Sequence, residues 1–286
     1  MTTATTPNVV VIGLGYVGLP LLVESSLAGH TCVGLDLDQR VVDSLNAGRS
    51  HVDDVTDETV AGMVERGFRA TTDASCLADA DVAIICVPTP LKDDQTPDLG
   101  AVNGASGSIA EHLHEGMLVV LESTTYPGTT DGVVRERLEQ SGLVAGRDFN
   151  LAFSPERIDP GNPTYQLRNT PKVVGGYTTA CTERASAFYA DVVDEVVPVS
   201  GTREAEMAKL LENTYRHVNI ALVNEIAVFS HDLGIDLWEA LRAADTKPFG
   251  FTAFYPGPGV GGHCIPIDPN YLSHSVRSLG YQFRFV

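Results

Sequence analysis

Short apolar runs rich in branched residues alternate along the chain with longer stretches in which apolar residues recur every three or four positions. Runs of the first kind indicate strands buried on both faces of a sheet, and stretches of the second kind indicate helices. Strands are predicted at residues 9–12, 32–35, 68–72, 82–87, 117–121, 149–153, 172–176 and 192–199. Helices are predicted up to about residue 28 and over residues 41–46, 55–67, 129–138 and 179–191. The alternation predicts an α/β fold, a Rossmann-like doubly wound parallel sheet, over residues 1–200.

The pattern changes at residue 203, where a stretch without glycine or proline runs to residue 233. At ~1.5 Å per residue, a helix over this stretch would be roughly 45 Å long. Its apolar residues surround much of the circumference, which predicts burial within its own domain and against a second subunit. Asp236 is predicted to cap a further short helix that carries Trp238. We therefore expect an all-α domain over residues 201–286 and a homodimer built on the 203–233 helix.

Composition narrows the class of protein. A hydrophobic content of 43% with 20% charged residues is typical of globular chains, and the net charge of −18 argues against nucleic acid or an anionic membrane as partner. The five cysteines are scattered and show no CxxC spacing, so neither a disulfide framework nor a metal site is indicated. No apolar run approaches the length of a membrane span, and no targeting segment is evident. These features predict a soluble, cytoplasmic protein.

The first predicted strand opens into a GxGxxG sequence formed by Gly13, Gly15 and Gly18. A second apolar strand ends at Asp36, about 20 residues further on, as the dinucleotide-binding fingerprint requires. Gly13 makes the tight turn, Gly15 lets a pyrophosphate approach the backbone, and Gly18 allows close packing of helix on strand. The acidic side chain of Asp36 would bind the adenosine ribose and disfavour a 2′-phosphate, which predicts NAD rather than NADP, although Arg40 is close enough to blur that preference.

Polar residues follow three later strands at the points where these strands end. They lie in the segments 88–90, 122–128 and 154–162. Ligands of open α/β sheets bind at the carboxyl ends of the strands, so these segments predict one active-site edge. For any single residue in them, an ordinary role in a turn is an equally good interpretation.

A glycine-rich loop near the C-terminus carries a candidate nucleophile. Four glycines in residues 257–262 precede Cys264, and Asp268 follows four residues later. The glycines indicate close approach of the backbone to a ligand, and the carboxylate near the thiol is not required by packing. The alternative is that Cys264 is a small buried hydrophobe. Lys209 and Asn213 lie four residues apart on the long helix and therefore share one face.

Six ordered blocks of this sequence resemble the UDP-glucose/GDP-mannose dehydrogenase family. They are GLGYVGLPL (13–21), CVPTPL (86–91), ESTTYPGTT (122–130), FSPERIDPGN (153–162), AEMAKLLENTYR (205–216) and GPGVGGHCIPIDP (257–269). The resemblance implies oxidation of C6 of a UDP-sugar to the uronic acid with two NAD per turnover, as in polysaccharide biosynthesis. It implies a Cys264 thiohemiacetal and thioester.

The resemblance also implies roles for individual residues. Catalytic roles fall to Cys264, Lys209, Asn213, Asp268, Glu156 and Thr124, with Lys209 and Asn213 as oxyanion donors and the last three placed to activate the hydrolytic water. Cofactor-binding roles fall to Gly13, Gly15, Tyr16, Val17, Gly18, Asp36, Arg40, Pro88, Thr89 and Thr124. Substrate-binding roles fall to Glu156, Arg157, Lys209, Asn213, Arg216, Tyr255 and Gly261.

Two departures from the family pattern bear on function. The family continues into a C-terminal UDP-binding domain, which is absent from this sequence, so a fragment and a shortened member are both open. The sugar-side sequences resemble the UDP-N-acetylglucosamine type, with UDP-glucose next, whereas the His and Arg of the mannosamine type are Pro248 and Gly250 here. The alternative function is an NAD-binding, dimerising module without turnover.

Overall fold

The computed structural model describes residues 6–159, 161–261, 267–277 and 280–281. The chain divides into two compact units, which are described separately. The first comprises residues 1–90 and 98–209, and the second comprises residues 91–97 and 210–286. The predicted nucleophile, Cys264, lies outside the described residues.

Eight strands of the first unit form one sheet in the order β3-β2-β1-β4-β5-β6-β7-β8, within the described part of the chain. The strands are β1 (Asn8–Ile12), β2 (Thr31–Leu35), β3 (Arg69–Thr71), β4 (Val82–Ile85), β5 (Leu118–Leu121), β6 (Asn150–Phe153), β7 (Lys172–Gly176) and β8 (Val196–Val199). Neighbouring strands are parallel except β6 and β7, which pair antiparallel. The prediction of a Rossmann-like, mostly parallel sheet is confirmed.

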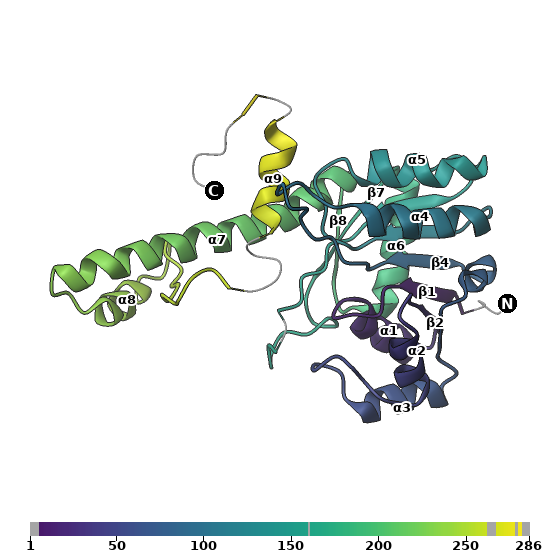
Figure 1. Ribbon diagram of the computed structural model, residues 1–286, viewed down its shortest axis with the longest axis horizontal. Coiled ribbons are helices and arrows are strands. Elements are labelled where there is room, and N and C mark those ends of the chain that lie inside the picture. The colour runs from purple at the N-terminus through teal and green to yellow at the C-terminus, as the bar shows by residue number, and fades with distance from the viewer. Residues whose placement is uncertain (1–5, 160, 262–266, 278–279, 282–286) are drawn as a thin grey trace. The chain divides into compact units, whose positions relative to one another are not determined.

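Helices cover both faces of this sheet (Figure 1). They are α1 (Gly18–Leu27), α2 (Gln39–Asn46), α3 (Asp57–Glu65), α4 (Gly100–His112), α5 (Arg135–Leu138) and α6 (Thr179–Val192). Three of them begin at the side-chain caps that their sequences suggest, because Asp38, Thr56 and Thr178 accept hydrogen bonds from N–H groups of the first turn.

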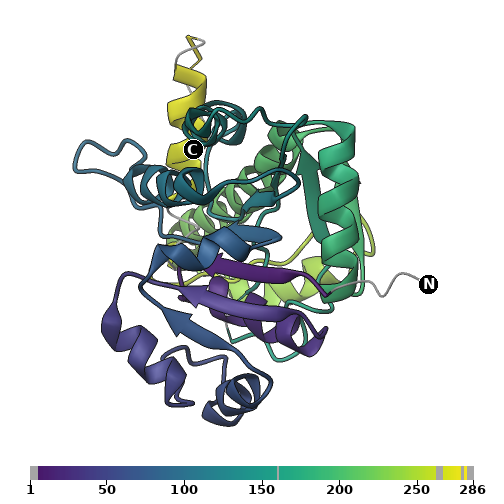
Figure 2. The same ribbon diagram turned by 90° about the vertical axis from the view of Figure 1, so that its right-hand side faces the viewer.

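The core consists of two layers, one on each face of the sheet. Val9 and Val11 of β1 belong to the layer that includes residues of α1, α3 and α6. Val10 and Ile12 of the same strand belong to the layer under α4 and α5. Alternate residues of a strand point to opposite faces, so a strand covered by helices on both faces must be apolar throughout. Figure 2 shows the strands of this unit in the view turned by 90°.

Two features of the first unit were not predicted. The antiparallel pairing of β6 and β7 reverses the direction of the last two strands, and an apolar run carries no information about its direction. Helix α4 was missed because its glycines lower helix propensity. A Cβ at Gly107 would lie 2.8 Å from the guanidinium of Arg137, which is the end of a flexible side chain that can shift.

The second unit contains most of the long helix α7 (Thr202–Asp232), together with α8 (Leu237–Asp245) and α9 (Asp268–Arg277). Helix α7 agrees closely with the predicted helix 203–233, and Asp236 caps α8 by accepting a hydrogen bond from the N–H of Glu239. Helix α9 was not predicted. Within this unit the ring of Tyr215 contacts that of Phe254 edge-on.

Candidate active site

The polar strand ends of the first unit lie side by side. The last residues of β1, β4, β5 and β6 are in register, since Ile12 pairs with Ile85, Ile85 with Leu121 and Leu121 with Phe153. The residues that follow these strands therefore emerge at one edge of the sheet. Strand β1 lies between β2 and β4, so the order of the strands reverses beside β1. This topological switch point is where open α/β sheets bind their ligands.

The glycine turn after β1 has the geometry of a dinucleotide site. Gly13 has φ +93°, and a Cβ there would lie 2.7 Å from the carbonyl oxygen of Cys86. A Cβ at Gly18 would lie 1.9 Å from the carbonyl oxygen of Gly13, whereas one at Gly15 would meet nothing within 4 Å. Gly13 and Gly18 are thus required by the fold, and Gly15 leaves open space. Val17, at the start of α1, makes no side-chain capping bond, so this helix N-terminus remains suited to a pyrophosphate.

Asp36 lies at the end of β2, next to this turn. Its carboxylate accepts hydrogen bonds from the backbone N–H groups of Leu14 and Asp38, both at 2.9 Å. These contacts fix the carboxylate beside the glycine turn. The guanidinium of Arg40 instead pairs with Asp38 at 2.7 Å and is exposed, so its charge is partly compensated. Tyr16 is half-exposed, and its hydroxyl donates to Asp53, which raises the pKa of the phenol.

The next two strand ends carry the other predicted cofactor residues. Pro88 and Thr89 follow β4, with Pro88 exposed and Thr89 half-buried, and Thr124 follows β5 in a half-buried position. Together with the glycine turn, these residues occupy neighbouring strand ends. The residues present therefore suit an NAD molecule lying along this edge.

Glu156, which follows β6, is connected to two other predicted site residues. Its Oε1 accepts hydrogen bonds from the N–H groups of Arg157 and Ile158 at 2.5 Å, and its backbone carbonyl accepts one from the Nζ of Lys209 at 2.5 Å. The guanidinium of Arg157 donates to the carbonyl oxygen of Pro171 at 2.6 Å. The structure thus brings Glu156, Arg157 and Lys209 together.

Glu206, one turn before Lys209, holds the start of α7 against the loop that follows β5. Its buried carboxylate accepts bonds from the N–H groups of Gly128 and Thr130, at 2.6 and 2.9 Å, and from the Thr130 hydroxyl at 2.7 Å. Burial raises the pKa of Glu206 to about 7, although these hydrogen bonds act in the opposite direction. Thr129 precedes the helical stretch after this loop, but its side chain makes no capping hydrogen bond, and the N–H groups of Gly128 and Thr130 donate to the carboxylate from α7 instead.

In the second unit, Asn213 and Asp268 form a pair. The side-chain amide of Asn213 donates to Oδ2 of Asp268, and both residues are buried. Asn224 accepts a hydrogen bond from the N–H of Gly257 at 2.9 Å, which fixes the start of the glycine-rich loop to α7. Tyr255 is half-exposed and stacks on Trp238, with ring centroids 5.9 Å apart.

Arg216 and Gly261 are both exposed. Of the site residues predicted in the second unit, the structure brings Asn213 and Asp268 into contact. Residues 262–266, which include Cys264, lie outside the described residues.

The four described cysteines are poor nucleophiles. Burial raises the pKa of Cys32 to about 12 and that of Cys86 well above its usual range, and it also raises the pKa of Cys76. Cys181 is fully buried. None of these four thiols therefore matches the accessible nucleophile expected from the sequence.

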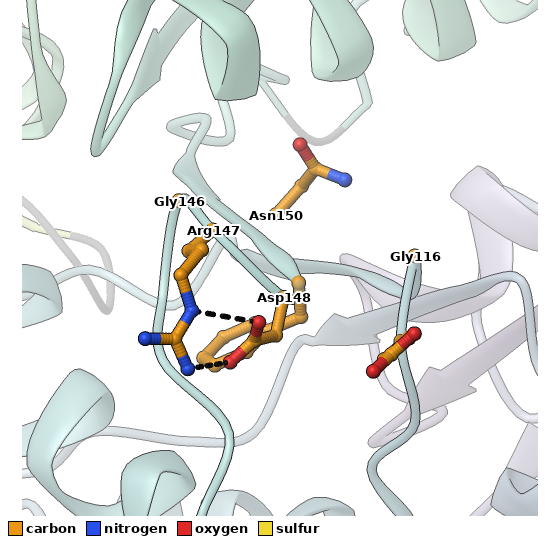
Figure 3. A pocket seen from close by; sticks show the side chains of 7 residues that line it. Gly116, Gly146, Arg147, Asp148 and Asn150 are labelled. Atoms are coloured by element: carbon orange, nitrogen blue, oxygen red, sulfur yellow. Dashed lines mark hydrogen bonds and ion pairs between the residues drawn. The ribbon is translucent and has the colours of Figure 1, made fainter.

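An open cavity of about 470 Å3 lies at the opposite end of the sheet (Figure 3). Gly116 and Asn150, at the starts of β5 and β6, line it together with Arg147 and Asp148, whose side chains point toward one another. The guanidinium of Arg147 binds the Asp148 carboxylate at 2.8 and 2.6 Å, so both charges are already satisfied. This cavity is separate from the carboxyl ends of the strands and is not part of the candidate site.

Comparison with known proteins agrees with this geometry. Residues 7–193 match the NAD binding domain of the UDP-glucose/GDP-mannose dehydrogenase family, and residues 203–286 match its central domain. The chain belongs to this family. Its first unit therefore carries the family's NAD binding domain, as the glycine fingerprint predicted.

One related sequence and two solved structures are similar to this chain over most of its length. A UDP-N-acetyl-D-mannosamine dehydrogenase of Salmonella typhi is 41% identical over 273 residues, which cover 92% of this chain and 64% of that protein. The structure of a UDP-D-ManNAc dehydrogenase from Pyrococcus horikoshii matches with a TM-score of 0.91 and 36% identity, covering 97% of this chain and 66% of that chain. A UDP-glucose dehydrogenase from Pyrobaculum islandicum matches with a TM-score of 0.88 and 28% identity, covering all of this chain and 67% of that chain.

These matches bear on two expectations from the sequence. The preference for the UDP-N-acetylglucosamine type is not supported, because high-scoring relatives are named for UDP-N-acetyl-D-mannosamine. That preference rested on the segments 154–162 and 247–264, with Pro248 and Gly250 as the argument against the mannosamine type, and these local features are less informative than the similarity of the whole chain. The chain also spans only about 64% of the length of these curated relatives.

Among the residues that the structure describes, none of the helices has the length and the apolar character needed to span a membrane. Within the same residues, no cluster of three or more histidine, cysteine or acidic side chains is arranged to hold a metal ion.

Sequence reasoning missed several buried polar residues near the strand ends. Glu122, Lys172, Tyr189 and Glu206 form hydrogen bonds to partners at least 50 residues away. A lysine at the start of an apolar strand and a glutamate before a polar loop were visible in the sequence. Neither indicated its partner.

Proposed function

We propose that this chain carries the cofactor-binding and catalytic parts of an NAD-dependent nucleotide-sugar 6-dehydrogenase. The observation that carries the proposal is the match of both its domains to one family, together with a glycine turn and Asp36 arranged for a dinucleotide. We propose a UDP-N-acetylhexosamine as substrate, with UDP-N-acetyl-D-mannosamine first, because relatives at about 40% identity are named for it. UDP-N-acetylglucosamine and UDP-glucose are the next candidates.

In the proposed mechanism the NAD site consists of Gly13, Gly15, Tyr16, Val17, Gly18, Asp36, Arg40, Pro88, Thr89 and Thr124. NAD, when bound there, supplies the acceptor for the hydride removed in each of two oxidations. A lysine, or an ordered water beside Asp268, takes the proton of the C6 hydroxyl in the first oxidation. The Cys264 thiolate attacks the resulting aldehyde, and Lys209 and Asn213 donate hydrogen bonds to the oxyanion that forms.

The second oxidation leaves a thioester on Cys264, which water must hydrolyse. Glu156, with Thr124 and Asp268, is proposed to orient and deprotonate this water. The hydroxide oxygen adds to the carbonyl carbon, the carbon–sulfur bond breaks, and the Cys264 thiolate leaves. Arg157, Arg216, Tyr255 and Gly261 are proposed to contact the nucleotide sugar.

The test is turnover of the chain with NAD and each of the three UDP-sugars separately. We expect two NADH per sugar consumed, with the highest kcat/KM for UDP-N-acetyl-D-mannosamine. Calorimetric titration should show NAD binding more tightly than NADP, because Asp36 disfavours a 2′-phosphate. Failure to bind NAD would contradict the proposal.

A second candidate function is an NAD-binding, dimerising module without turnover. The match of residues 7–193 to the family's NAD binding domain is consistent with it. NAD binding without NADH formation from any of the three sugars would support this candidate instead.

A further inference from the structure

A buried ionic cluster lies beneath the carboxyl ends of β5 and β6. Lys172, the first residue of β7, donates a hydrogen bond from Nζ to Oε2 of Glu122 at 2.8 Å. The hydroxyl of Tyr189, on α6, donates to the other oxygen of Glu122. The exposed fractions of the three residues are 3% or less. The three come from distant parts of the sequence and form one network.

The same lysine faces Glu156. Its Nζ lies 3.5 Å from Oε2 of Glu156. The other oxygen of Glu156 is held by the N–H groups of Arg157 and Ile158, and the described part of the chain offers Oε2 no hydrogen bond. The ammonium of Lys172 therefore faces the oxygen that these N–H groups do not hold.

The charges in the cluster are unequal, with one cation between two carboxylates. Burial opposes ionisation of Lys172, but Glu122 and Glu156 outweigh it and raise the pKa of the ammonium. Burial raises the pKa of Glu122, although Lys172 acts in the opposite direction. Lys172 therefore remains a cation, and Glu122 and Tyr189 hold it in place.

We propose that Lys172 is a positioning residue for Glu156: its ammonium, fixed by Glu122 and Tyr189, keeps the Glu156 carboxylate ionised and oriented beneath the reaction edge. This inference rests on the proposed function, in which Glu156 helps to deprotonate the water that hydrolyses the Cys264 thioester. An opposite charge within a few ångströms favours the ionised form of a carboxylate. Removing the cation should therefore reduce the ionised fraction of Glu156 at a given pH and leave its carboxylate less firmly oriented.

The first measurement does not depend on turnover. The carboxyl carbon of Glu156 is followed by 13C NMR during a pH titration of the full chain, with Glu156→Gln assigning the signal. In Lys172→Met the midpoint for Glu156 should move to higher pH, and in Lys172→Arg it should stay near the parental value. An unmoved midpoint in a folded Lys172→Met protein would overturn the proposal.

Tyr189→Phe is the matched control. It loosens the same buried network without removing a contact to Glu156, so it should lower the melting temperature and leave the Glu156 midpoint unchanged. If Tyr189→Phe moved the midpoint as far as Lys172→Met, the effect would be structural and the proposal would fail. Should Lys172→Met not fold, the double variant Lys172→Met with Glu122→Gln removes both partners of the pair, so no unpaired Glu122 charge stays buried.

The second measurement concerns the reaction. For Lys172→Met we expect at least a tenfold lower steady-state rate at neutral pH, with the initial burst of NADH and the affinity for NAD unchanged. Lys172→Arg should restore the rate. A parental chain that shows the Lys172–Glu156 coupling by NMR but oxidises no UDP-sugar would contradict the proposed function and leave the coupling standing. A folded Lys172→Met protein with the parental rate and pH profile would overturn the positioning role.

Discussion

Burial decides which of the titratable side chains discussed here are charged at neutral pH. Cys32 and Cys86 are buried thiols whose pKa values are raised, to about 12 for Cys32, so they carry little thiolate at neutral pH. Glu206 is a buried carboxylate whose pKa is raised to about 7. Cys32 and Cys86 are therefore unreactive, whereas the carboxyl group of Glu206 titrates in the physiological range.

At this scale we expect iodoacetamide to label Cys264 before the other cysteines, because the alkylated species is the thiolate. Cys264→Ala should lose the oxidation to the acid and keep its affinity for NAD, because the thioester cannot form. Mass spectrometry of labelled peptides and NADH counting measure these outcomes. Cys76→Ala, at a half-buried site, is the control and should keep its activity. Uronic acid formed at the parental rate by a folded Cys264→Ala protein would rule out the nucleophile.

A second residue-scale prediction concerns the pH dependence of stability. The pKa of Glu206 rises from 4.5 for the free side chain to about 7 in the folded protein. Its contribution to stability is therefore fully present below about pH 4.5 and is lost as the pH rises through about 7. The shift corresponds to about 3 kcal/mol of unfolding free energy.

Urea unfolding of the parent and of Glu206→Gln between pH 4.5 and 8 tests this expectation. The glutamine cannot ionise, so the stability difference between the two proteins should change across this range. A constant difference would show that Glu206 does not titrate there. Glu204→Gln, at an exposed position of the same helix turn, is the control.

At the scale of the element, the three glycines of the turn between β1 and α1 are needed for different reasons. Gly18 is required because its neighbour, the Gly13 carbonyl, leaves no room for a Cβ, whereas Gly15 faces open space. The fold therefore constrains two glycines, and we propose that the third serves a ligand that approaches the backbone.

Two alanine variants of this turn should therefore behave differently. Gly18→Ala should lower the free energy of unfolding by about 3 kcal/mol, through a steric clash that the helix and strand must relieve. Gly15→Ala should stay within about 0.5 kcal/mol of the parent and lose at least tenfold in NAD affinity. Thermal unfolding measures the stability of both variants, and calorimetric titration measures their affinity for NAD. Parental NAD affinity in Gly15→Ala would remove the assignment of Gly15 to the pyrophosphate.

At the scale of the whole molecule, α7 carries an exposed apolar stripe. Met207, Leu211, Tyr215, Leu222 and Phe229 fall on one face at helical spacing, and each is between 40 and 64% exposed. A single exposed apolar residue is ordinary, but a stripe over about six turns is typical of a contact surface. Because the same stripe on a second copy is complementary to it, we propose that α7 forms a two-fold homodimer.

Sedimentation velocity at micromolar concentration tests this proposal. The parent should be a dimer, and Leu222→Glu with Phe229→Glu should be a monomer, because burying two carboxylates in an apolar interface is unfavourable. Leu27→Glu, at an exposed apolar residue of α1, should leave the dimer intact. A monomeric parent would contradict the homodimer.

The sequence by itself determined the parts of this protein that depend on neighbouring residues. Strand β1 and the glycine turn were predicted correctly because each depends on a local pattern of apolar residues and on backbone conformations that glycine permits. Helix α7 was predicted for the same reason, since the absence of glycine and proline over its length is a local property. Family membership followed from the ordered motifs, because those motifs are also local.

Only the tertiary structure decided how distant residues pair. Lys172 binds Glu122 across 50 sequence positions, and Glu206 binds Thr130 across 76, within a sheet whose last two strands run in reverse. Periodicity reports which face of an element is buried, but it does not identify the side chain opposite. A buried charge must nevertheless find a partner, because leaving it unpaired is unfavourable. The identity of that partner depends on which strand ends lie side by side, and the order and direction of the strands decide this.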